Sequence, residues 1–497
     1  MLLSVLLLLV VGLFDVYLGT KRLWSKRKLL SALFSLVTII VSLYLLLISV
    51  VKQQFFIVLL VFIALYQLFN LYRLAKSQIN QEHLRRITLR SGFRLWLVQL
   101  LVAALGLFIY YYEPTFDIEL ALAVFSYVFG LSLLASTWRS KNVTQAVGNN
   151  SKLLPSNDLP TLTVAIPARD ESDSLLNCLG SILKNDYPKL EVFVLDDSST
   201  DRRTPEIIRS FAHDGVEFIP GKEFNEEWLA KNWAYQQLLE AANGEIILFC
   251  GADVHFSEDS LRFLVSSLVS RDKQMLSILP NNELPSSIWR RFYQPLRYAW
   301  EISIPRRALH RPPVLSTCWV ARREFLNNSG GFKAVSRRIS PESYFAKQAL
   351  KSDGYSFFHY EGVLSQKYSS AQFETSVRLR YPQLRRQVES VMLAALVELL
   401  GGLASLVLII LAILSLNWLV LFLALFAYFF IGVAFCMLLN LTYGKKLLSG
   451  ILLWPLYLVL DIYLMHLSMW RYELGVVLWK GRSITPSVMN HEPQPNA

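Results

Sequence analysis

Long apolar runs occupy both ends of the chain, and a polar middle section separates them. Five runs precede that section, at residues 2–19, 29–51, 55–75, 93–112 and 117–138. Three more follow it, near residues 391–413, 416–440 and 447–469. A helix of about 20 apolar residues crosses a hydrocarbon layer of about 30 Å, and the runs have about that length. The pattern predicts an integral membrane protein with five transmembrane helices in residues 1–139 and two or three spanning or re-entrant helices in residues 390–470.

The first run also has the apolarity of a secretory signal peptide. It lacks the basic start and the small-residue cleavage site of such peptides, and another apolar run follows at once. We therefore expect residues 2–19 to be retained as the first span.

Charges beside the first five runs predict their orientation. The segments 21–28 and 73–94 are strongly basic, whereas the segment 113–117 is acidic. Basic loops stay on the cytoplasmic side of a membrane. The amino terminus is therefore expected outside, and the section after Trp138 is expected in the cytoplasm.

The last apolar run fits this rule less well. Lys445, Lys446 and Arg471 flank it on both sides, and all three favour the cytoplasm. Pro455 and Asp461 interrupt the run, so a re-entrant helix and an interfacial helix both stay open. Residues 471–497 are expected to form a cytoplasm-facing tail whose polar, proline-containing end is disordered.

The middle section, residues 155–385, has the pattern of an α/β domain. Residues 161–167, 190–196 and 244–250 are continuous apolar runs rich in β-formers, as buried parallel strands are. Amphipathic stretches at residues 174–183 and 234–242 have helical spacing. The alternation predicts an open α/β sheet with flanking helices, and such sheets bind ligands at the carboxyl ends of their strands.

Each of these predicted strands ends in a polar cluster. The clusters are residues 167–172, 196–201 and 251–254. Carboxylates at strand ends can bind a base or ribose by hydrogen bonds and a hard divalent cation through oxygen. Asp and Ser also end strands and cap helices, which is the structural alternative for any one cluster. Three clusters in the expected order favour a binding site.

Composition supports the membrane interpretation. Hydrophobic residues make up 53% of the 497 residues, and the formal net charge is +11. The basic residues gather beside apolar runs, so we expect anionic lipid rather than nucleic acid as their partner. The four cysteines have neither the spacing of a zinc site nor that of a disulfide framework.

Several motifs carry a family resemblance. "VAIPARDES", "VFVLDDSSTD", "WLAKNWA", "EIILFCGADV", "ALKSDGY" and the tail motif "WKGR" lie between residues 119 and 482. Together they resemble the membrane-bound family 2 glycosyltransferases of GT-A fold, in particular carotenoid, hopanoid and ceramide glycosyltransferases. The resemblance implies inverting transfer of a hexose from a nucleotide sugar, such as a uridine diphosphate sugar, to a lipid acceptor at a bacterial plasma membrane.

The resemblance also implies roles for individual residues. Asp196 and Asp197 would contact the uracil and ribose, and Lys231 would approach the diphosphate. Asp253 would bind a magnesium or manganese ion that bridges the phosphates, because the leaving nucleotide diphosphate accumulates negative charge. The nucleotide pocket would be lined by Pro167, Arg169 and Glu171.

Two positions depart from the family pattern. Gly251 replaces the first acid of the metal-binding pair, which should weaken cation affinity. Ser343 occupies the place of the general base, and serine cannot take up a proton there near neutral pH. Glu342 can replace it if its side chain turns into the site, and a capping or surface role is the open alternative.

The remaining segments narrow the class of enzyme. The Gln-x-x-Arg-Trp motif of processive polysaccharide synthases does not follow Glu342. Residues 376–387 are basic with interspersed apolar positions, which is typical of an interfacial segment, with a solvated linker as the alternative. Arg482 of the tail is expected to contact either a phosphate group of the donor or anionic lipid of the membrane.

Two other function classes stay open at this point. Gly251 and Ser343 also fit a catalytically impaired relative that binds nucleotide sugar or lipid and acts as a regulator or assembly partner. A transporter that uses the first spans is less favoured, because those spans contain few intramembrane charges.

Overall fold

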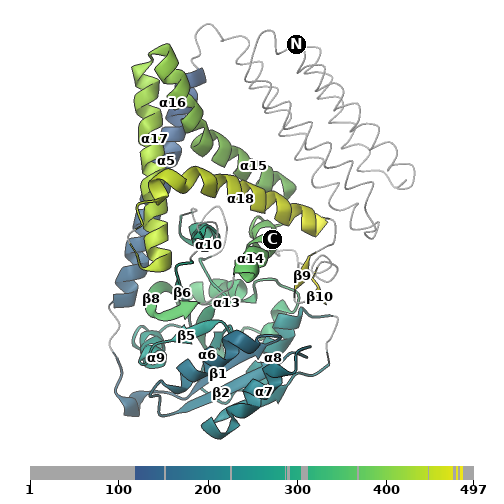
Figure 1. Cartoon of the computed structure of the whole chain (residues 1–497). Coiled ribbons are helices and arrows are strands. Elements are labelled where there is room, and N and C mark those ends of the chain that lie inside the picture. The colour runs from purple at the N-terminus through teal and green to yellow at the C-terminus, as the bar shows by residue number, and fades with distance from the viewer. Residues whose placement is uncertain are drawn as a thin grey trace, which may run out of the picture.

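A computed structural model describes most of the chain after the first four predicted spans, which lie outside the described residues. The described residues are 118–149, 153–223, 227–285, 287, 291–303, 312–365, 369–445, 447–473, 477–479 and 482–484. They form a sheet domain and a group of long apolar helices, with shorter helices between the two (Figure 1).

The sheet domain is built on eight strands in the order β3-β2-β1-β4-β7-β6-β8-β5. The strands are β1 (Leu162–Ala168), β2 (Leu190–Asp196), β3 (Val216–Pro220), β4 (Ile246–Cys250), β5 (Val254–Phe256), β6 (Met275–Asn282), β7 (Cys318–Arg322) and β8 (Tyr355–Ser365). Strand β1 pairs in parallel with both β2 and β4, whereas β7 runs antiparallel to β4. The open α/β sheet that the alternation predicted is confirmed, and so is the mixed, mostly parallel strand arrangement of the GT-A-like fold class that the resemblance implies.

Both faces of the sheet are buried, which explains the continuous apolar runs. Val164 and Leu248 belong to the core cluster on one face, and Ala165 and Phe249 belong to the cluster on the other. The flanking helices are α6 (Ser172–Leu183), α7 (Arg203–Ser210), α8 (Ala230–Ala241), α9 (Ser260–Ser270), α12 (Arg323–Asn328) and α13 (Pro341–Leu350). A strand with solvent on one side would alternate instead.

Four helical segments among the described residues are long and apolar enough to cross a membrane: Glu119–Gln145, Ser390–Ser415, Trp418–Tyr443 and Gly450–Tyr472. They correspond to α5 (Ile118–Asn149), to α15 (Val388–Glu398) with the π-helical turn η5 (Leu399–Leu403) and α16 (Ala404–Ser415), to α17 (Trp418–Tyr443) and to α18 (Gly450–Glu473). Four predicted apolar runs thus form long helices.

Helices α5 and α17 pack side by side and very closely. A Cβ atom added at Gly130 of α5 would lie 2.9 Å from the carbonyl oxygen of Ala427 on α17. Only glycine allows the two backbones to approach to this distance, as in many helix pairs in membranes. The helix that precedes the sheet domain is therefore held directly by a helix that follows it.

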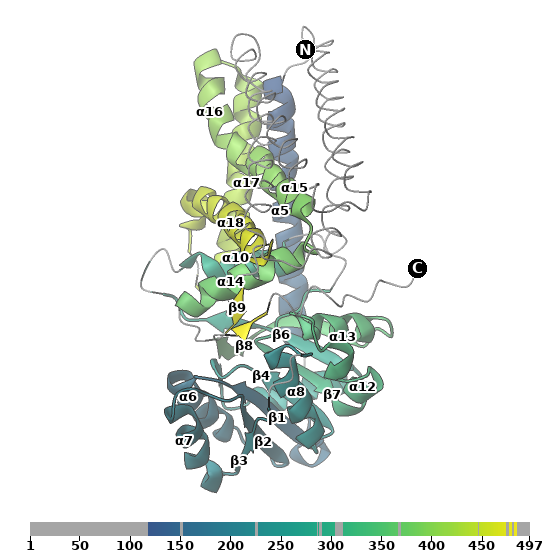
Figure 2. The ribbon, with the colours of Figure 1, turned by 90° about the vertical axis from the view of Figure 1, so that its right-hand side faces the viewer.

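Helix α18 runs across the long axes of α5 and α17 in both views (Figures 1 and 2). Pro455 lies within its first turns and does not end it. This course differs from that of an ordinary span beside α17, and it agrees with the interfacial and re-entrant alternatives. Its position in a bilayer stays a prediction.

Helices α10 (Tyr293–Ile302) and α14 (Ser369–Gln383) lie between the sheet and α18 (Figure 1). Arg380 of α14, which the sequence placed in a basic interfacial segment, is 1% exposed and points away from solvent. Its Nη2 lies 2.9 Å from Asp461 Oδ1 of α18, and Trp300 Nε1 of α10 donates to Asp461 Oδ2 at 2.7 Å. Three helices thus meet around one buried ion pair.

Replacing Arg380 with Met should destabilise the protein strongly, because it leaves the Asp461 carboxylate buried without its charge partner. We expect a loss of about 3–5 kcal/mol in the free energy of unfolding. The matched control is Arg471→Met, which breaks a 2.7 Å pair with the more exposed Glu374 and should cost about 0–1 kcal/mol. Thermal unfolding in detergent micelles measures both, and equal stability of the two variants would contradict the prediction.

Candidate functional site

The parallel register places three polar loops at one edge of the sheet. Ala168, the last residue of β1, lies opposite Asp196, the last residue of β2. Strand β4 pairs with β1 in the same direction and ends at Cys250. The segments that follow these strands therefore leave the sheet at the same edge, as the sequence predicted for its three polar clusters.

Some acids of these clusters accept hydrogen bonds from the loops and so stabilise the loop structure. Asp170 Oδ1 accepts hydrogen bonds from the backbone amides of Thr200 and Asp201, at 2.6 and 3.1 Å. Asp201 in turn accepts from the amide and the hydroxyl of Thr204 at the start of α7. The capping alternative therefore holds for Asp170 and Asp201. These bonds tie the loop after β1 to the loop after β2.

The predicted pocket residues lie around these loops. Pro167 is the sixth residue of β1, opposite Leu195, and is partly buried. Glu171 stands at the start of α6, where its Oε2 accepts a hydrogen bond from Ser174 Oγ at 3.2 Å. Asp196 Oδ1 accepts from the amide of Ser199 at 3.2 Å, within a tight turn. Strand pairing holds Pro167 in place, and local hydrogen bonds hold the side chains of Glu171 and Asp196.

Asp197 lies deeper than Asp196 and is 5% exposed. Arg169 Nη1 donates to its backbone carbonyl at 2.8 Å. Arg482 Nη1 donates to both carboxylate oxygens, at 3.0 and 2.9 Å. Burial raises the pKa of Asp197, and the hydrogen bonds and charge of Arg482, together with the charge of Arg169, oppose that rise. The predicted nucleotide-contacting acid is thus held between two guanidinium groups.

Lys231 and Glu342, two residues predicted from separate motifs, form an ion pair. Lys231 lies in the first turn of α8 and Glu342 in the first turn of α13, and Lys231 Nζ is 3.7 Å from Glu342 Oε2. Ser340 Oγ donates to Glu342 Oε1 at 2.7 Å. Glu342 is 3% exposed, so the surface alternative for this residue is wrong.

Tyr235 lies on the same helix as Lys231, one turn further on. It is fully buried on α8, and Lys231 Nζ lies 5.1 Å from the centre of its ring. Burial raises the pKa of Tyr235, and the charges of Glu342, Cys250 and Asp253 raise it further. Lys231 thus contacts both the ring of Tyr235 and the carboxylate of Glu342.

Ser343 does not take the place of a general base. Its hydroxyl donates to the carbonyl oxygen of Ser340 at 2.7 Å, which is a local bond of the helix start. Glu342 and Ser343 line a cavity of about 140 Å³ together with the cationic side chains of Arg337, Arg338 and Arg386. Glu342, and not Ser343, therefore presents a carboxylate to this cavity, which Glu301 also lines.

Asp253 lies in the turn after β4, where Gly251 takes the place of the first acid of the pair. A Cβ atom at Gly251 would lie 2.4 Å from Asp253 Oδ1, so the carboxylate folds back over the glycine. Among the described residues, no group of three His, Cys, Asp or Glu side chains is arranged to hold a metal ion. The donor set fits a cation of the Mg²⁺ type, which takes one or two carboxylates and obtains its other ligands from phosphates and water.

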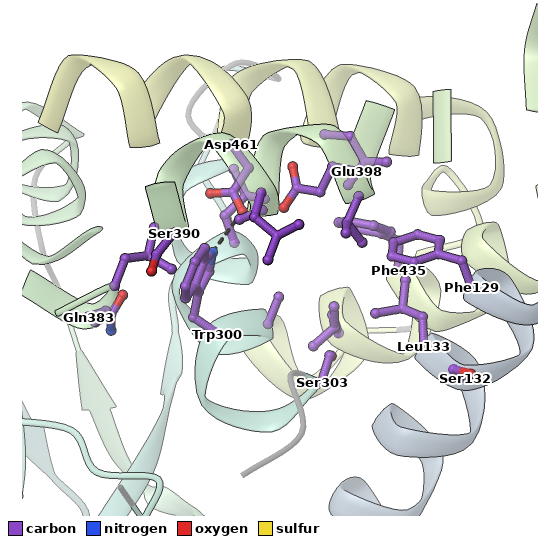
Figure 3. A pocket seen from close by; sticks show the side chains of 18 of the residues that line it. Phe129, Ser132, Leu133, Trp300, Ser303, Gln383, Ser390, Glu398, Phe435 and Asp461 are labelled. Carbon is purple, nitrogen blue, oxygen red and sulfur yellow. Dashed lines mark hydrogen bonds between the residues drawn. The ribbon is translucent and has the colours of Figure 1, made fainter. Parts of the chain in front are cut away.

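A larger, mainly apolar cavity of about 510 Å³ lies between α18, α15, α10 and α5. Phe129, Leu133, Trp300 and Phe435 line its apolar part (Figure 3). The carboxyl groups of Asp461 and Glu398 lie at its upper wall in this view (Figure 3).

The two cavities share a wall residue. Gln383, at the end of α14, lines both of them, and its Nε2 donates to Glu301 Oε1 at 3.1 Å. Glu301 also lines the smaller cavity, in which Glu342 lies. The apolar cavity among the long helices and the charged cavity of the sheet domain are therefore neighbours.

Arg482 is the site residue whose place the sequence did not determine. The "WKGR" motif singled it out, but its spacing fits a phosphate and a lipid surface equally well. The contact with Asp197 joins residues 285 positions apart and depends on the course of α18. A sequence pattern that is local along the chain carries no information about such a contact.

Comparison with known proteins supports the resemblance. Residues 163–330 match the family model described as Glycosyl transferase family 2. The chain is 31% identical over 136 residues to 4,4'-diaponeurosporenoate glycosyltransferase of Staphylococcus aureus strain bovine RF122 / ET3-1, covering 27% of this chain and 34% of that protein. The protein of strain USA300 is 31% identical over 135 residues, with the same coverage. The chain thus spans about a third of the length of these curated relatives.

Solved structures of glycosyltransferases show a weaker likeness. One is the mannosyltransferase PcManGT from Pyrobaculum calidifontis in complex with GDP-Man and Mn²⁺, with a TM-score of 0.41, 18% identity and coverage of 72% of this chain and 98% of that one. Another is S. aureus TarS 1–349 in complex with UDP, with a TM-score of 0.32, 15% identity and coverage of 63% and 92%.

The family match begins within β1 and runs past β7, so it covers the strand ends that carry Asp196, Asp197 and Asp253. The predicted resemblance and the predicted α/β, GT-A-like fold class are confirmed. Between its apolar helices the chain carries a sheet domain that matches the glycosyltransferase family 2 model over residues 163–330.

Proposed function

We propose that the protein transfers a hexose from a nucleotide diphosphate sugar, with uridine diphosphate as the leaving group, to a hydroxyl group of a membrane lipid. The observation that carries the proposal is the ion pair of Lys231 with Glu342, a buried acid that lines the smaller cavity, in a domain whose strand-end loops carry Asp197 and Asp253. The neighbouring apolar cavity supplies a place for the acceptor.

The donor occupies the strand-end loops in this proposal. Asp196 and Asp197 receive the base and ribose, with Pro167, Arg169 and Glu171 around them. Lys231 faces the diphosphate, and Asp253 is the residue that would hold a magnesium or manganese ion. Such an ion offsets the charge that the leaving diphosphate gains. Carboxylates, a lysine and a guanidinium at one sheet edge match the chemistry of a nucleotide sugar.

Glu342 acts as the general base. The acceptor oxygen forms a bond to the sugar carbon from the face opposite the diphosphate, the sugar–phosphate bond breaks, and the hydroxyl proton passes to Glu342. A base must lie within hydrogen-bond reach of that hydroxyl. Glu342 Oε2 is buried and accepts no hydrogen bond within the described part of the chain, so it can accept one from the acceptor.

The acceptor lipid enters from the larger cavity. Its hydrocarbon part contacts Phe129, Leu133 and Phe435, while its hydroxyl end passes Gln383 towards Glu342. Apolar lining with a few polar groups at one end is typical of sites for amphipathic ligands. With the orientation that the basic loops predict, the sheet domain faces the cytoplasm, where nucleotide sugars are present.

Replacing Asp253 with Asn or Glu342 with Gln should each reduce sugar transfer by about 10²–10⁴-fold, because the first removes the charged cation ligand and the second removes the base. The control is Asp214→Asn, an exposed acid just before β3, at the opposite edge of the sheet. The assay is transfer of radiolabelled hexose from uridine diphosphate sugar to extracted membrane lipid.

The same assay separates the proposal from its rival. A wild-type protein that binds uridine diphosphate but transfers no sugar to any lipid fraction would favour the non-catalytic relative. Activity that survives in both variants would contradict the roles of Asp253 and Glu342.

Gly251→Asp should raise the affinity for Mn²⁺ in the presence of uridine diphosphate by about tenfold or more, since the number of charged oxygen ligands tunes affinity over several decades. The new Cβ would lie 2.4 Å from Asp253 Oδ1, so the carboxylate end of Asp253 has to shift. Gly251→Ala is the matched control, because it displaces Asp253 without adding a ligand. Electron paramagnetic resonance of bound Mn²⁺ gives the affinity, and no gain over Gly251→Ala would count against a cation at Asp253.

A further inference from the structure

The described part of the C-terminal tail returns to the sheet domain as a short hairpin. Strands β9 (Leu478–Trp479) and β10 (Arg482–Ser483) pair antiparallel, with Arg482 opposite Trp479. The amide of Ile484 donates to the carbonyl oxygen of Val477 at 3.1 Å and closes the base of the hairpin. The hairpin lies beside the strand-end loops, below the end of α18 (Figure 1).

Apolar packing fixes the base of this hairpin. Val477 and Ile484 are 4% and 6% exposed. Both belong to a core cluster with Trp300 of α10, Tyr381 of α14 and Met469 of α18. The hairpin is thus part of the same packed unit as the helices between the sheet and the apolar segments, and Arg482 projects from a fixed base.

Arg482 makes a specific contact rather than a general electrostatic one. Its Nη1 bonds to both carboxylate oxygens of Asp197, and its Nη2 lies 3.5 Å from the carbonyl oxygen of the same residue. Arg169 holds that carbonyl from the other loop. Both guanidinium groups therefore define one position of Asp197, and the carboxylate keeps lone pairs for further donors.

The charge of Arg482 decides what Asp197 can recognise. An ionised carboxylate only accepts hydrogen bonds, which suits the N–H of a pyrimidine base and the hydroxyls of a ribose, whereas a protonated one also donates. Asp197 is buried, and burial favours its protonated form. Arg482 provides the hydrogen bonds and the charge that oppose this effect at the carboxylate itself.

We propose that Arg482 is a positioning residue for the nucleotide: it holds Asp197 as an ionised, correctly oriented acceptor for the nucleoside part of the donor. The donor site is then complete only when the hairpin that follows α18 is docked on the sheet domain. The proposal rests on the proposed function, since it takes Asp197 as a nucleotide contact.

The test measures the affinity of full-length protein in lipid nanodiscs for uridine diphosphate, by calorimetry at a fixed Mn²⁺ concentration. Arg482→Ala should weaken binding by at least about tenfold, as expected for loss of hydrogen bonds to a charged group. Arg482→Lys should recover part of the loss, because an ammonium restores the charge but not the two-oxygen geometry. Asp197→Asn should weaken binding as well, and the double variant should add little to either single change.

Two further readouts separate positioning from a structural role. In the transfer assay, Arg482→Ala should raise KM for the donor more than it lowers kcat, and KM for the lipid should not change. Arg471→Ala is the matched control, since it removes an arginine from the end of α18 whose partner is the more exposed Glu374. Its affinity for uridine diphosphate should equal that of the wild type.

Each other outcome overturns the inference in a recognisable way. Unchanged affinity in Arg482→Ala would show that the contact is only structural. Tighter binding would show a latch that the donor must displace, and a rise in KM for the lipid alone would show a lipid anchor. A wild-type protein that binds no nucleoside diphosphate would overturn the proposed function itself, and the inference with it.

Discussion

The parallel pairing of β1 with β2 and β4 is the constraint on which the candidate site depends. Residues that are far apart in sequence meet because three strands end at one edge in fixed register, with Ala168 opposite Asp196. The pairing is itself stabilised by burial of both sheet faces, so the apolar runs and the polar clusters are two parts of one arrangement. A shift of one residue in β2 would move Asp197 away from Arg169 and turn every side chain of the strand over.

A second constraint joins this edge to the apolar helices. The Arg380–Asp461 pair and the bond from Trp300 place charge and hydrogen bonding where α10, α14 and α18 meet. Burying two charges is costly unless their partners are well placed, so the three helices have little freedom to slide past one another. The larger and the smaller cavity therefore keep the same position relative to each other, with Gln383 in the wall that they share.

The sequence predicted the parts of this structure that depend on local pattern. It predicted strands at 161–167, 190–196 and 244–250 and helices at 174–183 and 234–242 from apolar spacing, and the structure has elements there whose ends differ by no more than four residues. It also predicted that Asp196, Asp197 and Asp253 lie at strand ends. The antiparallel insertion of β7 between β4 and β6 was not predicted, because strand order is decided by packing of distant segments.

Contacts between side chains that are distant in sequence could not be predicted for the same reason. Nothing in the motif of Lys231 indicates that Glu342 is its partner, and Asp170 and Asp201 look like site acids until their bonds to the loop are seen. Arg380 belongs to a basic stretch that resembles a surface segment, yet it is buried against an acid of α18. The sequence predicted an interfacial segment or a solvated linker there, and tertiary packing buries Arg380 instead.

The close approach of Gly130 to Ala427 has a consequence for movement of the sheet domain. The domain leaves the apolar helices at the end of α5 and rejoins them at α14 and α15, and α5 is held both by α17 and by the bond from Thr137 Oγ1 to Ser303 Oγ of α10. A domain that is joined to the helices at two separate points cannot rotate about a single hinge. Its position relative to those helices is fixed, so under the proposed function the acceptor has to move to the domain.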